Sequence, residues 1–425
     1  MRPILFLLSL LTVAACATAS AETLYIRAGQ LIDIDSGERL ADQAIVVADG
    51  RIVDVGDSGE IDPPDGARLV DLSGLTVLPG LTDAHVHLTS DHSKHGYRRL
   101  ADSLPRQTLT GARNARTTLM AGFTTVRNVG APGFSDVALR DAIADGDIPG
   151  PRLLVSGPPV GITGGHCSDN NLLPPEYNAV GDGVADGPWA ARAAVRRNVK
   201  YGVDLIKTCS TGGVLSRGTK VGAPQYTVEE LSALVDEAHM HGRKVASHAH
   251  GTEGIRNAIE AGVDSIEHAS FIDAEGIRMA AERGTVLAMD IYVTEFILGE
   301  GEAAGILPAS LEKERQTGAK QRENFEIALE AGATMGFGTD AGVFPHGHNA
   351  RQLSRMTRFG MTPLQALQAA TITNAELFGL EGQIGRIAPG YRADLIAVAA
   401  DPLDEIEALE QVDFVMKDGR IFKSP

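Results

Sequence analysis

The sequence predicts an α/β fold, a (β/α)8 barrel of the TIM type beside a small β-sandwich built from both chain ends. From residue 110 to residue 345, amphipathic helices that end at glycine alternate with short apolar strands, as is typical of a parallel sheet covered by helices. Strands at 77–85 and 152–157 bring the predicted number to eight, the number in a TIM barrel. The chain ends instead alternate polar and apolar residues, as antiparallel strands do.

The predicted barrel strands are short and apolar, and most of them follow a glycine that suits the left-handed position after a helix C-terminus. In chain order they span residues 77–85, 123–129, 152–157, 203–209, 244–250, 263–268, 285–290 and 334–340. The helix before the fifth strand is predicted to begin after Thr227, which can act as its N-cap, and Glu230 completes a capping box. Gly242 ends this helix.

The two chain ends are expected to pair into the β-sandwich. Strands are predicted at 24–34, 43–47 and 51–55, and Ala48-Asp49-Gly50-Arg51 reads as a hairpin turn. Further strands at 385–395 and 414–422 include Lys417-Asp418-Gly419-Arg420 as a second hairpin. The expected domains are a composite sandwich of residues 22–76 and 385–425, and a barrel of residues 77–384.

The N-terminus has the pattern of an export signal. Arg2 precedes an apolar run over residues 4–15, which is short for a membrane span. Cleavage after Ala19-Ser20-Ala21 would remove residues 1–21 as a signal peptide and leave a periplasmic or secreted protein. Val13-Ala14-Ala15-Cys16 also resembles a lipoprotein box, so an outer-membrane lipoprotein anchored through Cys16 is the alternative.

Charge and cysteine content limit the possible partners and covalent links. The formal net charge is −17 and no basic run is present, which argues against nucleic-acid binding because that affinity depends on Lys and Arg. After cleavage only Cys167 and Cys209 would remain, and two cysteines do not make a disulfide scaffold in a chain of this length. We therefore expect two buried, unpaired thiols.

Candidate metal ligands lie at the C-terminal ends of the predicted strands, where a TIM barrel gathers its functional side chains. His85 and His87 are two residues apart on one strand, so their imidazoles point to the same side. Imidazole and carboxylate are ligands that zinc and related metals accept. Taken alone, His268 reads as a core histidine and Asp340 as a helix N-cap. Together the candidates predict one metal centre: His85, His87, Lys207, His248, His268 and Asp340.

Lys207 lies within an apolar strand, where burial lowers the pKa of an amine. A neutral amine can react with carbon dioxide to form a carbamate, an anionic ligand able to bridge two metals. The alternative is an ordinary lysine whose stem lies on apolar surface while its ammonium reaches water. The nearby histidines and aspartate favour the carbamate.

Several other residues are candidates for catalysis or substrate binding. His166 follows the third strand in a Gly-rich loop, and it either donates to the scissile carbonyl or is only a loop residue. His250 shares a face with His248 and is expected to contact substrate. Arg217 and Lys220 lie in a second Gly-rich loop that lacks P-loop spacing; one or both could meet a substrate carboxylate, or the loop could simply be solvated. Tyr226, which follows this loop, is also assigned to substrate binding.

The motifs together resemble the amidohydrolase superfamily. They are His85-Val-His87 after Leu78-Pro-Gly-Leu, Lys207, His248, Ile266-Glu-His268-Ala, Gly338-Thr-Asp340-Ala and Gly385-Arg-Ile-Ala-Pro-Gly-Tyr-Arg-Ala-Asp-Leu. Within the superfamily, the chain is most similar to the imidazolonepropionase-like branch, and there to bacterial Xaa-Pro dipeptidases and ochratoxin-hydrolysing amidohydrolases. Thr163-Gly-Gly-His166, Ser247-His-Ala-His250-Gly and Lys207 favour these two groups over the imidazolonepropionases themselves.

The resemblance implies two divalent metal ions, expected as Zn²⁺. It implies that His85, His87 and Asp340 hold one ion and that His248 and His268 hold the other. Lys207, as N6-carboxylysine, and a hydroxide would bridge them. It also suggests a homo-oligomer.

The predicted activity is metal-dependent hydrolysis of a small amide with a free carboxylate, such as a dipeptide, an N-acyl amino acid or an ochratoxin-like amide. Asp340 would accept the water proton and pass it to the leaving amine, while His166 polarises the carbonyl and His250 orients the substrate. The alternatives are a cyclic amide hydrolase of the imidazolonepropionase type, a deaminase-type enzyme, and a non-catalytic, metal-binding exported protein.

Overall fold

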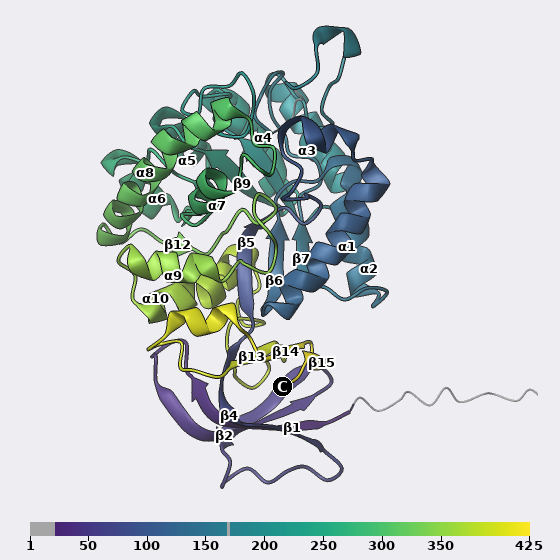
Figure 1. Ribbon diagram of the computed structural model, residues 1–425, viewed down its shortest axis with the longest axis vertical. Coiled ribbons are helices and arrows are strands. Elements are labelled where there is room, and N and C mark those ends of the chain that lie inside the picture. The colour runs from purple at the N-terminus through teal and green to yellow at the C-terminus, as the bar shows by residue number, and fades with distance from the viewer. Residues whose placement is uncertain (1–21, 168–170) are drawn as a thin grey trace, which may run out of the picture.

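The computed structural model describes residues 22–167 and 171–425. A helix-covered barrel lies above a β-sheet domain in Figure 1. The predictions for the signal peptide and for Cys16 concern residues outside the described part of the chain.

The barrel is built from eight short parallel strands. β5 pairs with β6 and β6 with β7, while β8 to β12 pair in sequence order. Parallel bridges between Val160 and Thr208 and between Val86 and Ala341 join the two sheets and close the ring. The predicted fold class is therefore confirmed. The strands are β5 (Leu81–Val86), β6 (Phe123–Asn128), β7 (Arg152–Val155), β8 (Leu205–Cys209), β9 (Lys244–Ala249), β10 (Ser265–His268), β11 (Val286–Ala288) and β12 (Met335–Gly336).

Helices cover the outside of the barrel. The predicted capping box is present, because Thr227 accepts from the Glu230 N–H and the Glu230 side chain accepts from the Thr227 N–H. Gly262 and Gly284 end two further helices with φ of 93° and 71°, the left-handed geometry that favours glycine. The helices are α1 (Leu104–Met120), α2 (Ser135–Ala144), α3 (Pro188–Lys200), α4 (Val228–Met240), α5 (Thr252–Ala261), α6 (Ala274–Arg283), α7 (Val293–Gly299), α8 (Pro308–Glu330), α9 (Arg351–Arg358), α10 (Pro363–Gln368) and α11 (Asn374–Phe378).

Within the described residues, no helix combines the length and the apolar character needed to cross a bilayer.

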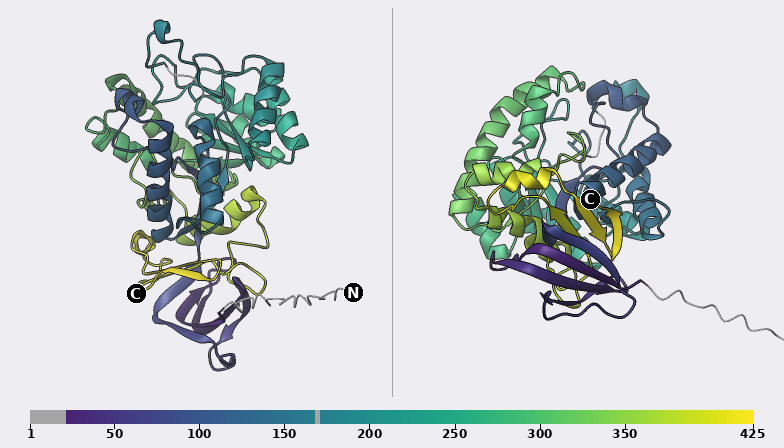
Figure 2. Two further views of the ribbon diagram at one scale, coloured as in Figure 1. Left: turned by 90° about the vertical axis from the view of Figure 1, so that its right-hand side faces the viewer. Right: turned by 60° about the horizontal axis from the view of Figure 1, so that its bottom comes forward.

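The second domain is a seven-stranded sheet with the order β15-β14-β13-β4-β1-β2-β3. The purple N-terminal strands and the yellow C-terminal strands meet in it, as Figure 1 and Figure 2 show. β4 joins the two chain ends, because it pairs in parallel with β1 and antiparallel with β13. The strands are β1 (Leu24–Ile32), β2 (Arg39–Ala48), β3 (Arg51–Asp57), β4 (Arg68–Pro79), β13 (Leu395–Val398), β14 (Phe414–Lys417) and β15 (Arg420–Lys423).

Two predicted strands differ from the structure. Residues 77–79 were expected to begin the barrel, but they end β4 of the sheet domain, and β5 begins at Leu81. Gly80 separates the strands, and a Cβ there would lie 2.2 Å from the Thr124 hydroxyl. An unbroken apolar run has no periodicity that could reveal this break. The strand expected at 385–395 is also wrong, because the chain pairs as a strand only over Leu395–Val398.

Polar contacts fix the sheet domain to the barrel. Arg152 of β7 contacts Asp394 at 2.6 Å and Asp418 at 2.5 Å. The Lys417 ammonium donates to the Gly150 carbonyl at 2.8 Å. The two bodies are thus held together at the N-terminal ends of the barrel strands, away from the C-terminal ends where the site lies.

Candidate active site

The structure brings the first predicted ligand group together at the C-terminal ends of the strands. His85 Nε2 lies 3.3 Å from His87 Nε2. Asp340, which follows β12, places Oδ1 3.3 Å from His85 Nε2 and 3.2 Å from His87 Nε2. Three polar atoms from opposite ends of the sequence thus converge on one point.

A second group lies beside the first. The ligand atoms of His248, His250 and His268 all lie within 4.8 Å of one another. His268 also connects the groups, since its ring centroid is 5.1 Å from that of His85. Asp290, which sequence reasoning did not single out, forms another such group with His268 and Asp340.

Lys207 lies on β8 near both groups and is 3% exposed. Its ammonium nitrogen has no hydrogen-bond partner among the described residues. Burial is the largest influence on this amine and lowers its pKa to about 8, against the attraction of Glu267. An amine with this pKa is partly neutral near pH 7, as carbamate formation requires.

His85 is oriented from behind by a buried ion pair. Glu267 Oε2 lies 3.2 Å from His85 Nδ1, while Arg127 donates to Glu267 Oε1 at 2.6 Å. Burial alone would raise the pKa of Glu267, but the Arg127 guanidinium holds it below its usual range. A carboxylate behind an imidazole fixes the ring and leaves Nε2 for a ligand.

His268 and His250 are held by hydrogen bonds at Nδ1. His268 Nδ1 lies 2.9 Å from both oxygens of Asp290, and Gln321 of α8 donates to Asp290 at 2.8 Å. His250 Nδ1 lies 2.8 Å from the Ser270 hydroxyl. In both rings, Nε2 is the atom left for other partners.

The backbone is strained at two candidate ligands. His268 has φ of 71° and Asp340 has φ of 60°, values that non-glycine residues rarely adopt. Such strain costs about 1–3 kcal/mol per residue and gathers at functional sites. It is consistent with side chains placed for chemistry rather than for stability.

A cavity of about 600 Å³ opens over both groups. Arg217 lines it and donates to the Tyr97 hydroxyl at 3.1 Å. Lys220 is not among its lining residues. Nor is Tyr226, which is buried and donates to the Ala185 carbonyl at 2.6 Å.

Arg99 is a cavity residue that sequence reasoning missed. It lies in a short 3-10 turn, Gly96–Ala101, outside the barrel motifs. Its side chain is open to solvent, yet surrounding protein lowers its pKa, a combination expected inside a hollow. Within the described part of the chain, its guanidinium has no carboxylate in ion-pair range, whereas Lys94 beside it is paired with Asp102 at 2.7 Å.

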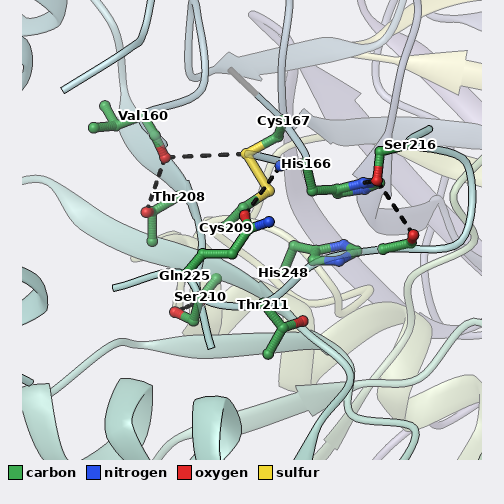
Figure 3. The surroundings of a disulfide bond; sticks show 12 residues. Val160, His166, Cys167, Thr208, Cys209, Ser210, Thr211, Ser216, Gln225 and His248 are labelled. Atoms are coloured by element: carbon green, nitrogen blue, oxygen red, sulfur yellow. Dashed lines mark hydrogen bonds between the residues drawn. A yellow bond between two sulfur atoms is a disulfide. The ribbon is translucent and has the colours of Figure 1, made fainter. Parts of the chain in front are cut away.

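The two expected free thiols are instead joined. Cys167 and Cys209 form a disulfide with Cα atoms 6.1 Å apart, as Figure 3 shows. The prediction of unpaired thiols is wrong because it was based on the number of cysteines and on the apolar strand that contains Cys209. Neither feature shows that the loop after β7 folds back onto β8. His166, next to Cys167, lies with its ring stacked on His248 at 4.1 Å between centroids.

The residues present fit a divalent metal centre. The donors are imidazoles and a carboxylate, which zinc and similar ions prefer. Most of them are buried, and Lys207 adds an amine that has no partner in the described part of the chain. Carboxylate or hydroxyl groups lie behind several of the rings, as is usual around metal ligands.

Comparison with known proteins identifies the family. The Amidohydrolase family model matches residues 76–422. The chain belongs to the amidohydrolase family. It is 33% identical to ochratoxinase of Aspergillus niger over 435 residues, which covers 96% of this chain and 88% of that protein.

Two other proteins are similar to the chain over most of its length. A solved Xaa-Pro dipeptidase with methionine bound in its active site is 38% identical with a TM-score of 0.88, and covers 95% of this chain and 100% of its own. Imidazolonepropionase of Rhizorhabdus wittichii is 25% identical over 83% of this chain and 87% of that protein. The resemblance found in the sequence is confirmed, and the chain is a hydrolase that acts on amide bonds.

Proposed function

We propose that this protein is a metal-dependent hydrolase of dipeptides or N-acyl amino acids, including ochratoxin-like amides, that carry a free carboxylate. The observation that carries the proposal is the convergence of imidazoles and Asp340 near the Lys207 amine, which has no hydrogen-bond partner within residues 22–167 and 171–425. A buried amine without a partner is costly, and conversion to a carbamate between two metals removes that cost.

In this proposal, His85, His87 and Asp340 would hold one ion and His248 and His268 the other, and Lys207, as N6-carboxylysine, would supply a ligand to both. Two Zn²⁺ ions are the expected occupants. When bound, the ions would supply Lewis acidity, which polarises an amide carbonyl and makes a nearby water more acidic.

Asp340 is suited to move a proton. Burial alone would raise the pKa of its carboxyl, but His85 and His87 hold it well below its usual range. The carboxylate is therefore ionised at neutral pH and can accept the proton of the attacking water at Oδ2. It would then deliver that proton to the leaving amine, acting as base and then acid.

His166 and His250 are suited to hold the substrate as neutral donors. Burial lowers the pKa of both imidazoles well below the usual value, and neighbouring cationic groups add to the effect. A neutral ring already engaged through Nδ1, as both are, can present an Nε2–H to a carbonyl oxygen. His166 is assigned to the scissile carbonyl and His250 to substrate orientation.

Arg99 and Arg217 support the requirement for a carboxylate. Both line the cavity, and a guanidinium matches the geometry of a carboxylate. The 38% identical Xaa-Pro dipeptidase holds methionine, a free amino acid, in its active site. The same kind of product is proposed here.

The experiment is a panel of dipeptides, N-acyl amino acids and ochratoxin A, assayed for release of the free amino acid. A matched set has the carboxylate blocked as an amide, and cyclic amides complete the panel. We expect turnover that a chelator abolishes and that depends on the carboxylate. Preference for cyclic amides, or metal binding without turnover on any member, would contradict the proposal.

We also propose export through the 1–21 leader and a homo-oligomeric assembly. The Cys167–Cys209 disulfide supports export, because such bonds persist in oxidising compartments. Cell fractionation with N-terminal sequencing would distinguish signal cleavage from lipidation at Cys16, and light scattering would give the subunit number.

A further inference from the structure

The disulfide lies within the candidate active site. Cys167 directly follows His166, and Cys209 is the last residue of β8, two residues after Lys207. Both cysteines line the cavity. The bond therefore ties the loop that carries His166 to the strand that carries Lys207.

The surface beneath His166 is well fixed. Its ring packs so closely over Gly213 that a Cβ there would lie 2.3 Å from it, and its Nδ1 lies 2.8 Å from the Ser216 hydroxyl. Lys313 of α8 anchors this platform by donating to the Gly213 and Ser216 carbonyls at 3.1 and 2.7 Å. The platform is held without the disulfide.

His166 itself has weaker ties to the barrel. Its backbone N–H donates to Gln225 at 3.0 Å, and the ring stacks on His248 (Figure 3). Upstream, Thr163 is bound to the Asp186 carboxylate at 2.9 and 2.7 Å. Among the described residues, the cross-link closest to the His166 ring is the disulfide at Cys167, the next residue.

We propose that the Cys167–Cys209 disulfide is a positioning element of the active site: it holds the His166 imidazole over Gly213 and against His248, so that the enzyme is fully active only in its oxidised form. This inference rests on the proposed function for its kinetic consequence, although not for its structural one. Displacement of a catalytic group by about 1 Å can lower a rate by about a hundredfold.

The link can be removed chemically or genetically. A water-soluble phosphine attacks one sulfur and breaks the S–S bond, and water then supplies the oxygen of the phosphine oxide while two thiols form. The genetic counterpart is Cys167→Ala with Cys209→Ala, since alanine at the buried position 209 introduces no unpaired hydroxyl. Peptide mapping of the untreated protein must first show Cys167 linked to Cys209; two free thiols would overturn the proposal.

The structural readout needs no substrate. Hydrogen–deuterium exchange of the purified, metal-loaded protein should be faster over residues 161–167 in the double variant, and unchanged in β8 and β9. Exchange equal to that of the unmodified protein would overturn the proposal even if no substrate were found. Failure of the substrate panel alone would instead count against the proposed function.

The kinetic readout is a comparison with His166→Ala. The double cysteine variant should lose about tenfold to a hundredfold in kcat at unchanged metal content. Adding it to His166→Ala should lower kcat by no more than about twofold, because both changes remove the same contribution. If the losses in kcat of the cysteine variant and of His166→Ala multiply instead, the disulfide does not act through His166. Phosphine should slow the unmodified enzyme and leave the double cysteine variant unaffected.

Discussion

Two cations of the cavity, Lys207 and Arg99, have no side-chain hydrogen-bond or ion-pair partner anywhere in residues 22–167 and 171–425. Charged groups in a protein are normally paired, because desolvating a lone charge is unfavourable. The buried Lys207 therefore marks a position where something outside the chain is expected to bind, and Arg99, which is open to solvent in the cavity, is free to contact a ligand. Under the proposed function, Lys207 would take up carbon dioxide and then metal, and Arg99 would contact the substrate carboxylate.

Replacing Lys207 by Ala tests the bridging role. Because the carbamate would contact both ions, we expect kcat/KM to fall by at least about a hundredfold and metal content to drop below two ions per chain. Elemental analysis and steady-state kinetics measure both. Lys320→Ala is the control, since Lys320 is an exposed partner of Glu323. Full turnover and full metal content in the Lys207 variant would exclude the bridge.

Replacing Arg99 by Gln tests carboxylate recognition. Loss of a charge-assisted contact of about 1.5–3 kcal/mol predicts a fall in kcat/KM of about ten- to a hundredfold for substrates with a free carboxylate. Substrates blocked as amides should react at an unchanged rate. The neighbouring Arg98, which donates to the Ala303 carbonyl at 2.7 Å, provides the matched control. Equal losses on both substrate sets would argue against the contact.

At the level of elements, α8 has an unusual buried face. Beside the buried apolar residues Leu311, Phe325 and Ala328, it carries a buried polar stripe whose members are alternately four and three residues apart, the spacing of one helix face. Two of its amides reach the site directly, since Gln321 donates to the His268 carbonyl and to Asp290, and Asn324 donates to the Ser270 carbonyl. The helix thus supports the ligands from outside the barrel. The stripe is Ser310, Glu314, Thr317, Gln321 and Asn324.

Glu314 predicts a pH dependence of stability. Burial raises its pKa to about 7, whereas the unfolded carboxyl titrates near 4.5. The folded state therefore binds the proton more tightly, and stability falls as the pH rises through this window, by up to about 3 kcal/mol. Glu314→Gln should remove this loss. The free energy of unfolding of the variant, relative to that of the unmodified protein, should therefore be higher at pH 8 than at pH 4.5.

Urea unfolding at the two pH values measures the effect. Glu312→Gln on the same helix is the control, because Glu312 is exposed and Arg315 lowers its pKa. An improvement of the same sign and size in the control variant, or none in Glu314→Gln, would show that the buried carboxyl is not the cause.

The elements also show what sequence reasoning could and could not reach. Histidines at strand ends were found because imidazole pairs at period two have a chemical signature. Glu267 and Asp290 were missed because they act through the Nδ1 of a histidine, and Arg127 was missed because it acts through Glu267. Nothing in a single strand shows which side chain lies behind a ring. The Cys167–Cys209 bond was missed because it joins segments whose contact depends on tertiary folding.

On the scale of the whole molecule, the barrel was predictable because its repeat of helix, glycine and strand occurs many times, so small errors at single boundaries do not change the count. The sheet domain was less accessible, since β4 shares one apolar run with the first barrel strand and β13 is only four residues long. Its hairpin turns at Asp49-Gly50 and Asp418-Gly419 were nevertheless predicted, because Asp-Gly pairs favour tight turns. The structure confirms them, since all four residues have positive φ.

Metal removal should affect the whole fold. The proposed ions bind groups from both ends of the barrel sequence and from β8 to β10, so binding to the folded state alone would stabilise it by about 4 kcal/mol at a thousandfold excess over Kd. We expect chelation to lower Tm and abolish turnover, and added Zn²⁺ to restore both. Differential scanning calorimetry measures Tm. An unchanged Tm after verified metal removal would contradict the proposed centre.

The position of β4 between the two chain ends has a consequence for biosynthesis. One edge of β4 stays without a neighbour until β13 has been made, and β13 begins only at Leu395. An open β-edge invites pairing with other chains. The nascent polypeptide therefore carries an unpaired β-edge from the synthesis of β4 until β13 has been made, a stretch of the chain over which pairing with other chains competes with folding.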